Sequence, residues 1–212
     1  MAMKQAQCKL CRREGKKLML KGERCESPKC AIVKRNYAPG ASGAKNMRRK
    51  VTEYGTQLRE KQKAKRIYGI YEGQFKKYYD KAMKAKTETA DSLITTLEMR
   101  LDNVIFRTGI AKSRRQARQL VNHGHFFVNK FKTDIPSYQV KADDIIKIKE
   151  SKENITFFKT LKEELKKKKE NEAPGWISFD KSKMQIKILS KPNVAELDTG
   201  FDPKMIIEFY SR

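Results

Sequence analysis

A stripe of aromatic and small apolar residues follows helical spacing in the first half of the chain. Phe75, Tyr78, Tyr79 and Ala82 stand at positions i, i+3, i+4 and i+7, which is one face of a helix. Such aromatic side chains could stack on nucleobases, but a stripe with this period is more typical of a buried face. We therefore predict a helix after Gly69 that packs into a core.

Residues 91–150 carry the clearest pattern. One helix is predicted from an apolar stripe made of Leu93, Ile94, Leu97, Leu101, Val104 and Ile105. A second helix should begin at Ser113, because Gln116 completes a capping box, and it should stop at Gly124. Its buried stripe would be Ala117, Leu120 and Val121. Its opposite face would carry Arg115, Gln119 and Asn122, with Arg118 alongside and Arg114 near the edge.

Short strands are predicted on both sides of a further helix. The strands are expected at 126–129, 135–136, 145–148, 176–179 and 184–188. The helix is expected within 151–171, where Ile155, Phe158, Leu161 and Leu165 recur at helical spacing. The pattern as a whole predicts an α+β protein whose central module is a helix, a turn, a basic helix and a small sheet.

The charge of the chain restricts its partners. Lys and Arg number 49 against 25 Asp and Glu, a net charge of +24, and 38% of residues are hydrophobic. The positive charge is spread over the whole chain, which favours a protein wrapped by nucleic acid over a single membrane-surface helix. Solubility alone needs far less charge. No signal peptide or membrane-spanning stretch is expected, so the protein should be intracellular, with no membrane or small-molecule partner.

The four cysteines, Cys8, Cys11, Cys25 and Cys30, all lie near the N-terminus. Two short-spaced pairs separated by thirteen residues are typical of a closed structural zinc site with four thiolate ligands. Disulfides are rare inside cells. We therefore expect one structural Zn²⁺, which would replace a core that this short basic segment cannot build. An iron–sulfur cluster and redox-active thiols are the alternatives.

Basic residues gather in two stretches after the cysteines. Residues 34–50 form a loop rich in Gly and Pro that ends in Arg48, Arg49 and Lys50. Residues 59–66 crowd five cations onto a predicted helix, and only Glu53 and Glu60 offset them locally. Contact with phosphates is the favoured interpretation, and a solvated helix face is the alternative.

Several stretches resemble the bacterial-type small-subunit ribosomal protein S-four family. Residues 97–109 and 113–125 are similar to its S-four RNA-binding module. Further similarity lies in 20–30, 53–63, 67–79 and 207–212, so nearly the whole chain is covered. Two positions depart from the family pattern. Ser42 replaces a family His in the basic loop, and Lys130 replaces a Gly in the sheet turn, where a left-handed Lys would be strained.

The resemblance implies a domain order. Residues 1–45 would form the zinc-binding N-terminal segment and basic loop, and 46–90 a helical domain completed by about 172–212. Residues 91–150 would be the inserted RNA-binding module, 151–171 a helical connector, and 172–212 a C-terminal hairpin and tail.

The resemblance also implies partners. These are small-subunit ribosomal RNA, neighbouring ribosomal proteins such as S-five, and mRNA near the channel by which it enters the cytoplasmic ribosome. The chain would bind early in assembly and support translational accuracy. The residues expected to contact RNA are Arg12, Arg13, Lys34, Arg35, Arg48, Arg49, Lys50, Arg59, Lys61, Lys63, Lys65, Arg66, Lys76, Lys77, Lys112, Arg114, Arg115, Arg118, Asn122 and His123.

Two other functions compete with this interpretation. Arg100-Leu101-Asp102 is similar to a motif of pseudouridine synthases, in which the Asp is catalytic, but here the triplet lies in an apolar helical stripe. Asp102 is therefore expected to cap a helix or to pair with Arg100 or Arg107, and no catalytic residue is predicted. A zinc-containing DNA-binding regulator is the second alternative, and it would read bases in the major groove. His123 and His125 are weak candidates for metal ligands.

Overall fold

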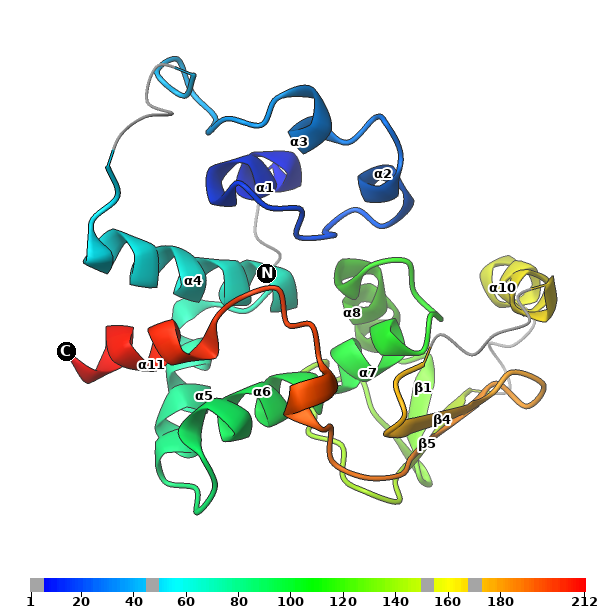
Figure 1. Ribbon diagram of the computed structural model, residues 1–212. Helices are drawn as coiled ribbons and strands as arrows, with labels where there is room; N and C mark the ends of the chain where they lie inside the picture. The colour runs from blue at the N-terminus through cyan, green and yellow to red at the C-terminus, as the bar shows by residue number, and fades with distance from the viewer. Residues whose placement is uncertain (1–5, 45–49, 150–154, 168–172) are drawn as a thin grey trace. The chain divides into compact units, whose positions relative to one another are not determined.

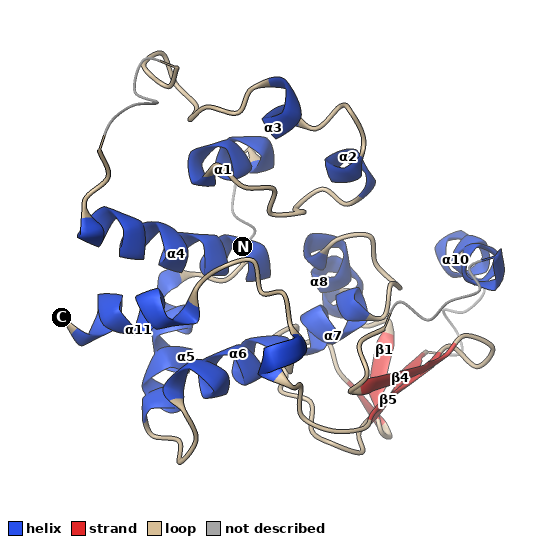
Figure 2. Cartoon of the chain, viewed as in Figure 1, coloured by secondary structure: helices blue, strands red, loops and turns tan. Residues whose placement is uncertain are grey.

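The computed structural model describes residues 6–44, 50–149, 155–167 and 173–212 (Figure 1). The chain divides into two compact units. One comprises Met1–Ile94 with Asp198–Arg212, and the other comprises Thr95–Leu197. The division falls within helix α6 (Thr89–Glu98). The first unit is helical where it is described, and the second combines helices with a sheet (Figure 2), so the predicted α+β class is confirmed.

The first unit begins with three short helices, α1 (Gln7–Glu14), α2 (Glu23–Glu26) and α3 (Ala31–Lys34). Helix α1 ends because Gly15 adopts the left-handed conformation, with φ 66°. Leu10 and Leu18 are buried here together with three of the cysteines. This is a small apolar core for such a segment, so other contacts must hold it in place.

Helices α4 (Glu53–Tyr68) and α5 (Glu72–Met83) follow. The hydroxyl of Thr52 accepts a hydrogen bond from the Gly55 N–H at 3.1 Å and caps α4, which ends at the left-handed Gly69. Helix α5 buries the predicted stripe of Phe75, Tyr78, Tyr79 and Ala82. The core interpretation of these aromatic residues is thus confirmed.

Helix α11 (Pro203–Ser211) returns the end of the chain to the first unit. The carboxylate of Asp202 caps it by accepting from the Lys204 N–H at 2.8 Å. The helix packs against α4, where the Gln57 amide donates to Glu208 Oε2 at 2.9 Å. The ring of Tyr210 stacks on Tyr79 with 4.6 Å between centroids. Residues far apart in sequence therefore complete this unit.

The second unit contains helices α7 (Leu101–Arg107) and α8 (Arg114–Asn122). As predicted, Ser113 caps α8 by accepting from the Gln116 N–H at 3.2 Å, and Gly124 ends it with φ 65°. The Gln116 side chain accepts from the Lys112 N–H, so the reciprocal bond of the capping box is displaced by one residue. Ala117 and Val121 are fully buried, and Leu120 packs partly against the same core.

One antiparallel sheet runs through the second unit in the strand order β2-β1-β3-β5-β4. The strands are β1 (Phe126–Val128), β2 (Phe131–Lys132), β3 (Ile145–Ile148), β4 (Ile177–Asp180) and β5 (Gln185–Ile188). A buried row crosses it, because Val128 pairs with Ile146 and Ile146 with Ile186. Helix α10 (Thr156–Lys167) adds Phe158, Leu161 and Leu165 to the core.

The predicted strands are confirmed apart from the one at 135–136. Ile135 is exposed, and Pro136 has no N–H to donate to a ladder. The carbonyls of this loop serve α7 instead, since Pro136 O accepts from the Asp102 N–H and Tyr138 O from the Leu101 N–H. The strand that pairs with β1 in the hairpin is β2, which begins directly after the turn.

The stretch 172–212 does not act as one piece. Its hairpin, β4–β5, pairs with β3 and so extends the sheet formed by β1, β2 and β3, whereas α11 packs on α4. A short 3-10 helix, η2 (Val194–Glu196), lies between them in sequence. The hairpin joins the sheet because the edge of β3 that does not pair with β1 offers backbone N–H and C=O groups, which β5 can satisfy.

The turn between β1 and β2 explains how Lys130 is tolerated. The left-handed residue is Asn129, with φ 56°, and Lys130 has no positive φ. Asn is one of the residues that accept this conformation at low cost. The turn therefore differs from the one in which Lys130 would be strained.

In the part of the chain that is described, no helix combines the length and apolar character needed to cross a bilayer.

Candidate nucleic-acid interface

A cationic cleft lies on the N-terminal segment, among α1, α2 and α3. It has a volume of about 810 Å³. The lining residues are Arg12, Glu23, Arg24, Ser27, Lys29, Ala31, Lys34 and Arg35. Five cations against one carboxylate make a concave surface that suits phosphate groups. The fold thus gathers three of the predicted contacts, Arg12, Lys34 and Arg35, in one place.

Two cleft residues, Arg24 and Lys29, were absent from the predicted RNA contacts. Arg24 directly precedes Cys25, and Lys29 directly precedes Cys30. Their positive charge, next to the predicted contacts Lys34 and Arg35 in a short segment, is the feature of the sequence that could have identified them. Helices α2 and α3 fold this segment back into a compact turn. Arg13, a predicted contact on α1, is exposed but does not line the cleft.

Arg12 also holds the basic loop in place. Its Nε donates to the Tyr37 carbonyl at 3.0 Å, and its Nη2 donates to the Ala38 carbonyl at 3.3 Å. The guanidinium lies 4.8 Å from the centre of the Tyr37 ring, a cation–π contact. Arg12 therefore links α1 to the loop that follows α3. Two nitrogen atoms of its guanidinium group are engaged in hydrogen bonds within the protein.

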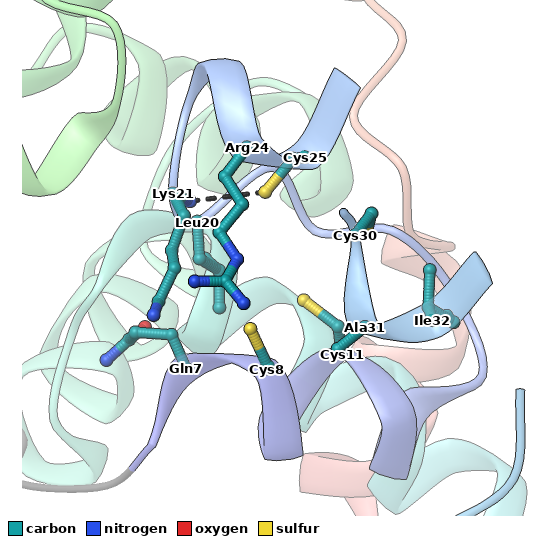
Figure 3. A pocket seen from close by; sticks show the side chains of 10 residues that line it. All are labelled: Gln7, Cys8, Cys11, Leu20, Lys21, Arg24, Cys25, Cys30, Ala31 and Ile32. Atoms are coloured by element: carbon teal, nitrogen blue, oxygen red, sulfur yellow. Dashed lines mark hydrogen bonds between the residues drawn. The ribbon is translucent and has the colours of Figure 1, made fainter. Parts of the chain in front are cut away.

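The four cysteines line a second, much smaller cavity of about 10 Å³. Figure 3 shows Cys8 and Cys11 from α1 on one side and Cys25 and Cys30 on the other. The Lys21 N–H donates to Cys25 Sγ at 3.3 Å. All four thiols are free of disulfides. A cavity of this size holds about one water-sized particle.

The thiol chemistry suits a cation. Burial raises the pKa of the Cys11 thiol, and the charges of Cys25, Cys8 and Cys30 raise it further, against a backbone hydrogen bond at Leu18. Thiolates that repel one another in a small cavity are stabilised by a soft divalent ion. As placed, however, no set of three or more His, Cys, Asp or Glu side chains among the described residues converges as metal ligands do.

The cations of α4 are mostly paired inside the unit. Arg59 and Arg66 both bind Glu14 Oε1 of α1, with Arg59 at 3.3 Å. Lys65 binds Glu72 at 2.6 Å, and Lys63 binds Glu60 at 2.5 Å. These four side chains are partly buried. Their charges are thus largely neutralised by carboxylates, two of which, Glu14 and Glu72, lie outside α4.

Lys61, a predicted RNA contact, is buried inside the first unit. The residue is 6% exposed. Its ammonium binds Glu72 Oε1 at 2.8 Å and lies 4.1 Å from the centre of the Phe209 ring. The spacing of α4 turns this position toward α5 and α11, so the side chain belongs to the interior.

Glu14 and Glu72 respond oppositely to their surroundings. Burial raises the pKa of Glu14, although Arg66 and Arg59 oppose this. Partial burial also acts to raise the pKa of Glu72, but hydrogen bonds from Lys61, Lys65 and Tyr210 outweigh it and lower the pKa to about 2. Glu72 is therefore ionised at any ordinary pH and holds two cations of α4.

On α8, more of the predicted RNA contacts lie at the surface than on α4. Arg115, Gln119, Asn122 and His123 are exposed. Arg118 is partly exposed, and its Nη1 lies 3.8 Å from Asp102 Oδ2. Arg114 faces inward: it donates to Asn103 Oδ1 at 2.7 Å and lies 4.4 Å from the centre of the Phe106 ring. The basic face of α8 thus runs from Arg115 to His123.

Other predicted contacts are single exposed cations. Lys50, Lys76, Lys77 and Lys112 are exposed, and Lys112 lies 3.6 Å from Glu164. Arg48 and Arg49 lie outside the described residues. These positions add positive surface without forming a defined cleft.

Asp102 is engaged in the interior and not in a substrate site. Arg100, which is 1% exposed, donates to both of its carboxylate oxygens at 3.0 and 2.7 Å. Arg107 instead grips Glu98 through two bonds of 2.9 and 2.8 Å. Of the alternatives predicted for Asp102, the pairing with Arg100 is therefore confirmed.

Comparison with known proteins agrees with this geometry. The family described as Ribosomal protein S4/S9 N-terminal domain matches residues 2–98, and the S4 domain family matches residues 99–146. The small ribosomal subunit protein uS4A of Alkaliphilus metalliredigens is 50% identical over 207 residues, which cover 98% of this chain and 97% of that protein. The uS4 protein of Acetivibrio thermocellus is 48% identical with the same coverage. This chain therefore belongs to the uS4 family of small ribosomal subunit proteins.

Proposed function

We propose that this chain binds small-subunit ribosomal RNA mainly through phosphate contacts made by the N-terminal cleft and by the exposed face of α8. As a uS4 protein it is an rRNA-binding constituent of the small subunit in the cytoplasmic ribosome, and it is not an enzyme. The observation that carries the proposal is the cleft, where Arg12, Arg24, Lys29, Lys34 and Arg35 face a single carboxylate.

The salt dependence of binding tests the phosphate mechanism. If about six phosphates are neutralised, affinity should fall by about three decades over a fourfold rise in salt. Lys34→Ala and Arg35→Ala should each lower the slope of log affinity against log salt by about one. Lys183→Ala removes an exposed cation from the β4–β5 turn and serves as a charge-matched control. A flat salt response would contradict the proposal.

Competition separates this function from that of a DNA-binding regulator. A junction of RNA helices displays 2′-hydroxyls and A-form geometry, which duplex DNA lacks. At equal salt and equal length, the RNA junction should displace duplex DNA from the protein. Preference for duplex DNA would favour the regulator.

We further propose that Cys8, Cys11, Cys25 and Cys30 hold one structural Zn²⁺. Their shared cavity, the N–H of Lys21 directed at Cys25 and the absence of disulfides among them support this. A bound ion would supply the stability that a segment with two buried leucines lacks.

Metal analysis and one substitution test the zinc proposal. Protein purified without chelator should contain about one zinc per chain, and Cys11→Ser should lose it. The N-terminal segment of the variant should then exchange its amide hydrogens quickly, while the sheet of the second unit stays protected. Zinc-free protein with the same protection as wild type would contradict a structural ion.

The resemblance to the family extends the proposal to assembly and neighbours. We propose that the chain binds ribosomal RNA early, without help from other proteins, and lies near ribosomal protein S-five and the incoming mRNA, where it supports translational accuracy. Binding to protein-free ribosomal RNA at physiological salt tests the first point. Cross-linking within intact subunits tests the second.

A further inference from the structure

The tip of the β1–β2 hairpin presents an unusual side chain to solvent. Phe131 is 77% exposed, more than any other large apolar residue described. It opens β2 at the edge of the sheet, directly after the turn at Asn129 and Lys130. Nothing in the proposed function so far uses this position.

The pairing of the strands explains the exposure. Phe131 pairs with Val128, so both side chains lie on the same side of the sheet as the buried Ile146. Val128 is covered and Phe131 is not, which means that the apolar core ends between them. Single exposed apolar residues are common on protein surfaces, so exposure alone assigns no role.

The charges around Phe131 indicate what it could bind. Lys130 and Lys132 on either side are exposed, and Asp134 is the nearest acid along the chain. The Lys132 side chain runs back toward the end of α8: a Cβ added at Gly124 would lie 2.6 Å from its Cε. The ammonium of Lys132 therefore lies close to Gly124, at the end of the α8 face that carries Arg115, Asn122 and His123.

The turn that carries Phe131 is fixed by hydrogen bonds. The Asn129 N–H donates to the Ile145 carbonyl at 2.7 Å, and Asn129 Oδ1 accepts from the Ile145 N–H at 2.9 Å. Asn129 Nδ2 donates to Asp144 Oδ1 at 3.0 Å. A rigid aromatic residue loses little conformational entropy on binding. The hairpin is therefore pre-organised to present its ring.

We infer that Phe131 is a stacking platform for one unpaired RNA base, with Lys130 and Lys132 on the adjoining phosphates. This inference rests on the proposed RNA-binding function and assigns a contact outside the cleft and α8. An exposed ring between cations matches the way in which single-stranded RNA is held, through stacking and backbone charge. A protein partner would require an apolar surface, and the exposed lysines that precede and follow Phe131 in the chain disfavour it.

Substitutions at Phe131 test the inference on the full chain with small-subunit ribosomal RNA. Phe131→Ala should weaken binding by about 5- to 100-fold, the usual contribution of one stacked base. Phe131→Leu should bind about as weakly, and Phe131→Tyr should bind like wild type. The salt slope should stay unchanged in all three, whereas Lys130→Ala should lower it by about one. Leu189→Ala, which truncates another exposed apolar residue of the same unit, is the matched control.

Three results would overturn the inference. Equal affinity of wild type and Phe131→Ala would remove the contact. Wild-type affinity in Phe131→Leu would replace stacking by a generic apolar contact. Intact RNA binding with poor retention of neighbouring proteins in assembled subunits would make Phe131 a protein contact. A wild-type chain with no affinity for the RNA would instead overturn the proposed function itself.

Discussion

Helices α4 and α8 are both rich in basic residues, yet they use their charges differently. In α4, Arg59, Lys61 and Arg66 bind carboxylates that come from α1 and α5. In α8, Arg115 and Asn122 are exposed on the face opposite the buried Ala117 and Val121. The density of cations in a sequence therefore does not distinguish a ligand-binding face from an internal ion network. The position of the acids in the folded chain does.

The largest expected effect is at Lys61. Lys61→Ala removes the ion pair with Glu72 and the contact with the Phe209 ring, so the free energy of unfolding should fall by about 2 kcal/mol. The RNA affinity of the folded variant should stay within about twofold of wild type, because no phosphate contact is lost. Urea unfolding and filter binding measure the two quantities. Lys77→Ala, an exposed lysine of α5, should leave stability unchanged.

Arg114 should behave like the cations of α4 although it lies on α8. Arg114→Ala removes the bond to Asn103 and the contact with the Phe106 ring, which should cost about 1.5 kcal/mol of unfolding free energy. Thermal unfolding of the variant checks this. A variant as stable as wild type but impaired in RNA binding would assign Arg114 to the RNA surface instead.

Substitution of Arg115 should have the opposite result to substitution of Arg114: RNA affinity should fall while stability is kept. Arg115→Ala should weaken RNA binding by about fivefold, roughly 1 kcal/mol, through the loss of one phosphate contact. Its unfolding free energy should change by less than about 0.5 kcal/mol, because the side chain is exposed. If stability fell as far as in Arg114→Ala, the contrast between the two faces of α8 would disappear.

The smallest effect that we expect is a change in the way the unfolding free energy depends on pH in acid. The pKa of Glu72 is about 2 in the folded chain against 4.5 for an unperturbed Glu, so its stabilising effect is complete above about 4.5 and is lost as the pH falls toward 2. Glu72→Gln removes this titration. The variant should therefore lose less unfolding free energy than wild type between about pH 5 and pH 3. Identical acid profiles for the two proteins would exclude Glu72 as the source.

Local patterns were predictable from the sequence. The stripe of α5, the Ser113 cap and the Gly124 stop depend on residues within a few positions of one another, so periodicity and capping rules reach them. The gathering of the cysteines was also predictable, because it depends on short spacings and two short helices.

Long-range contacts were not predictable from those patterns. Glu14 and Arg66 are 52 residues apart, so the sequence offered no reason to pair them, and α4 was interpreted as a phosphate-binding face. The pairing of β3 with β5 likewise joins segments separated by α10. Arg24 and Lys29 became cleft residues only once α2 and α3 had turned the segment back on itself.

The discontinuity of the first unit has a consequence for synthesis on the ribosome. Thr95–Leu197 is complete in sequence before α11 has been translated, so this unit can fold while the chain is still attached. Helix α4 must wait, because Glu208, which binds its Gln57, is translated only after the whole of the second unit, as is Tyr210, which binds Glu72. Synthesis of α11 is therefore the event that allows the N-terminal unit to close.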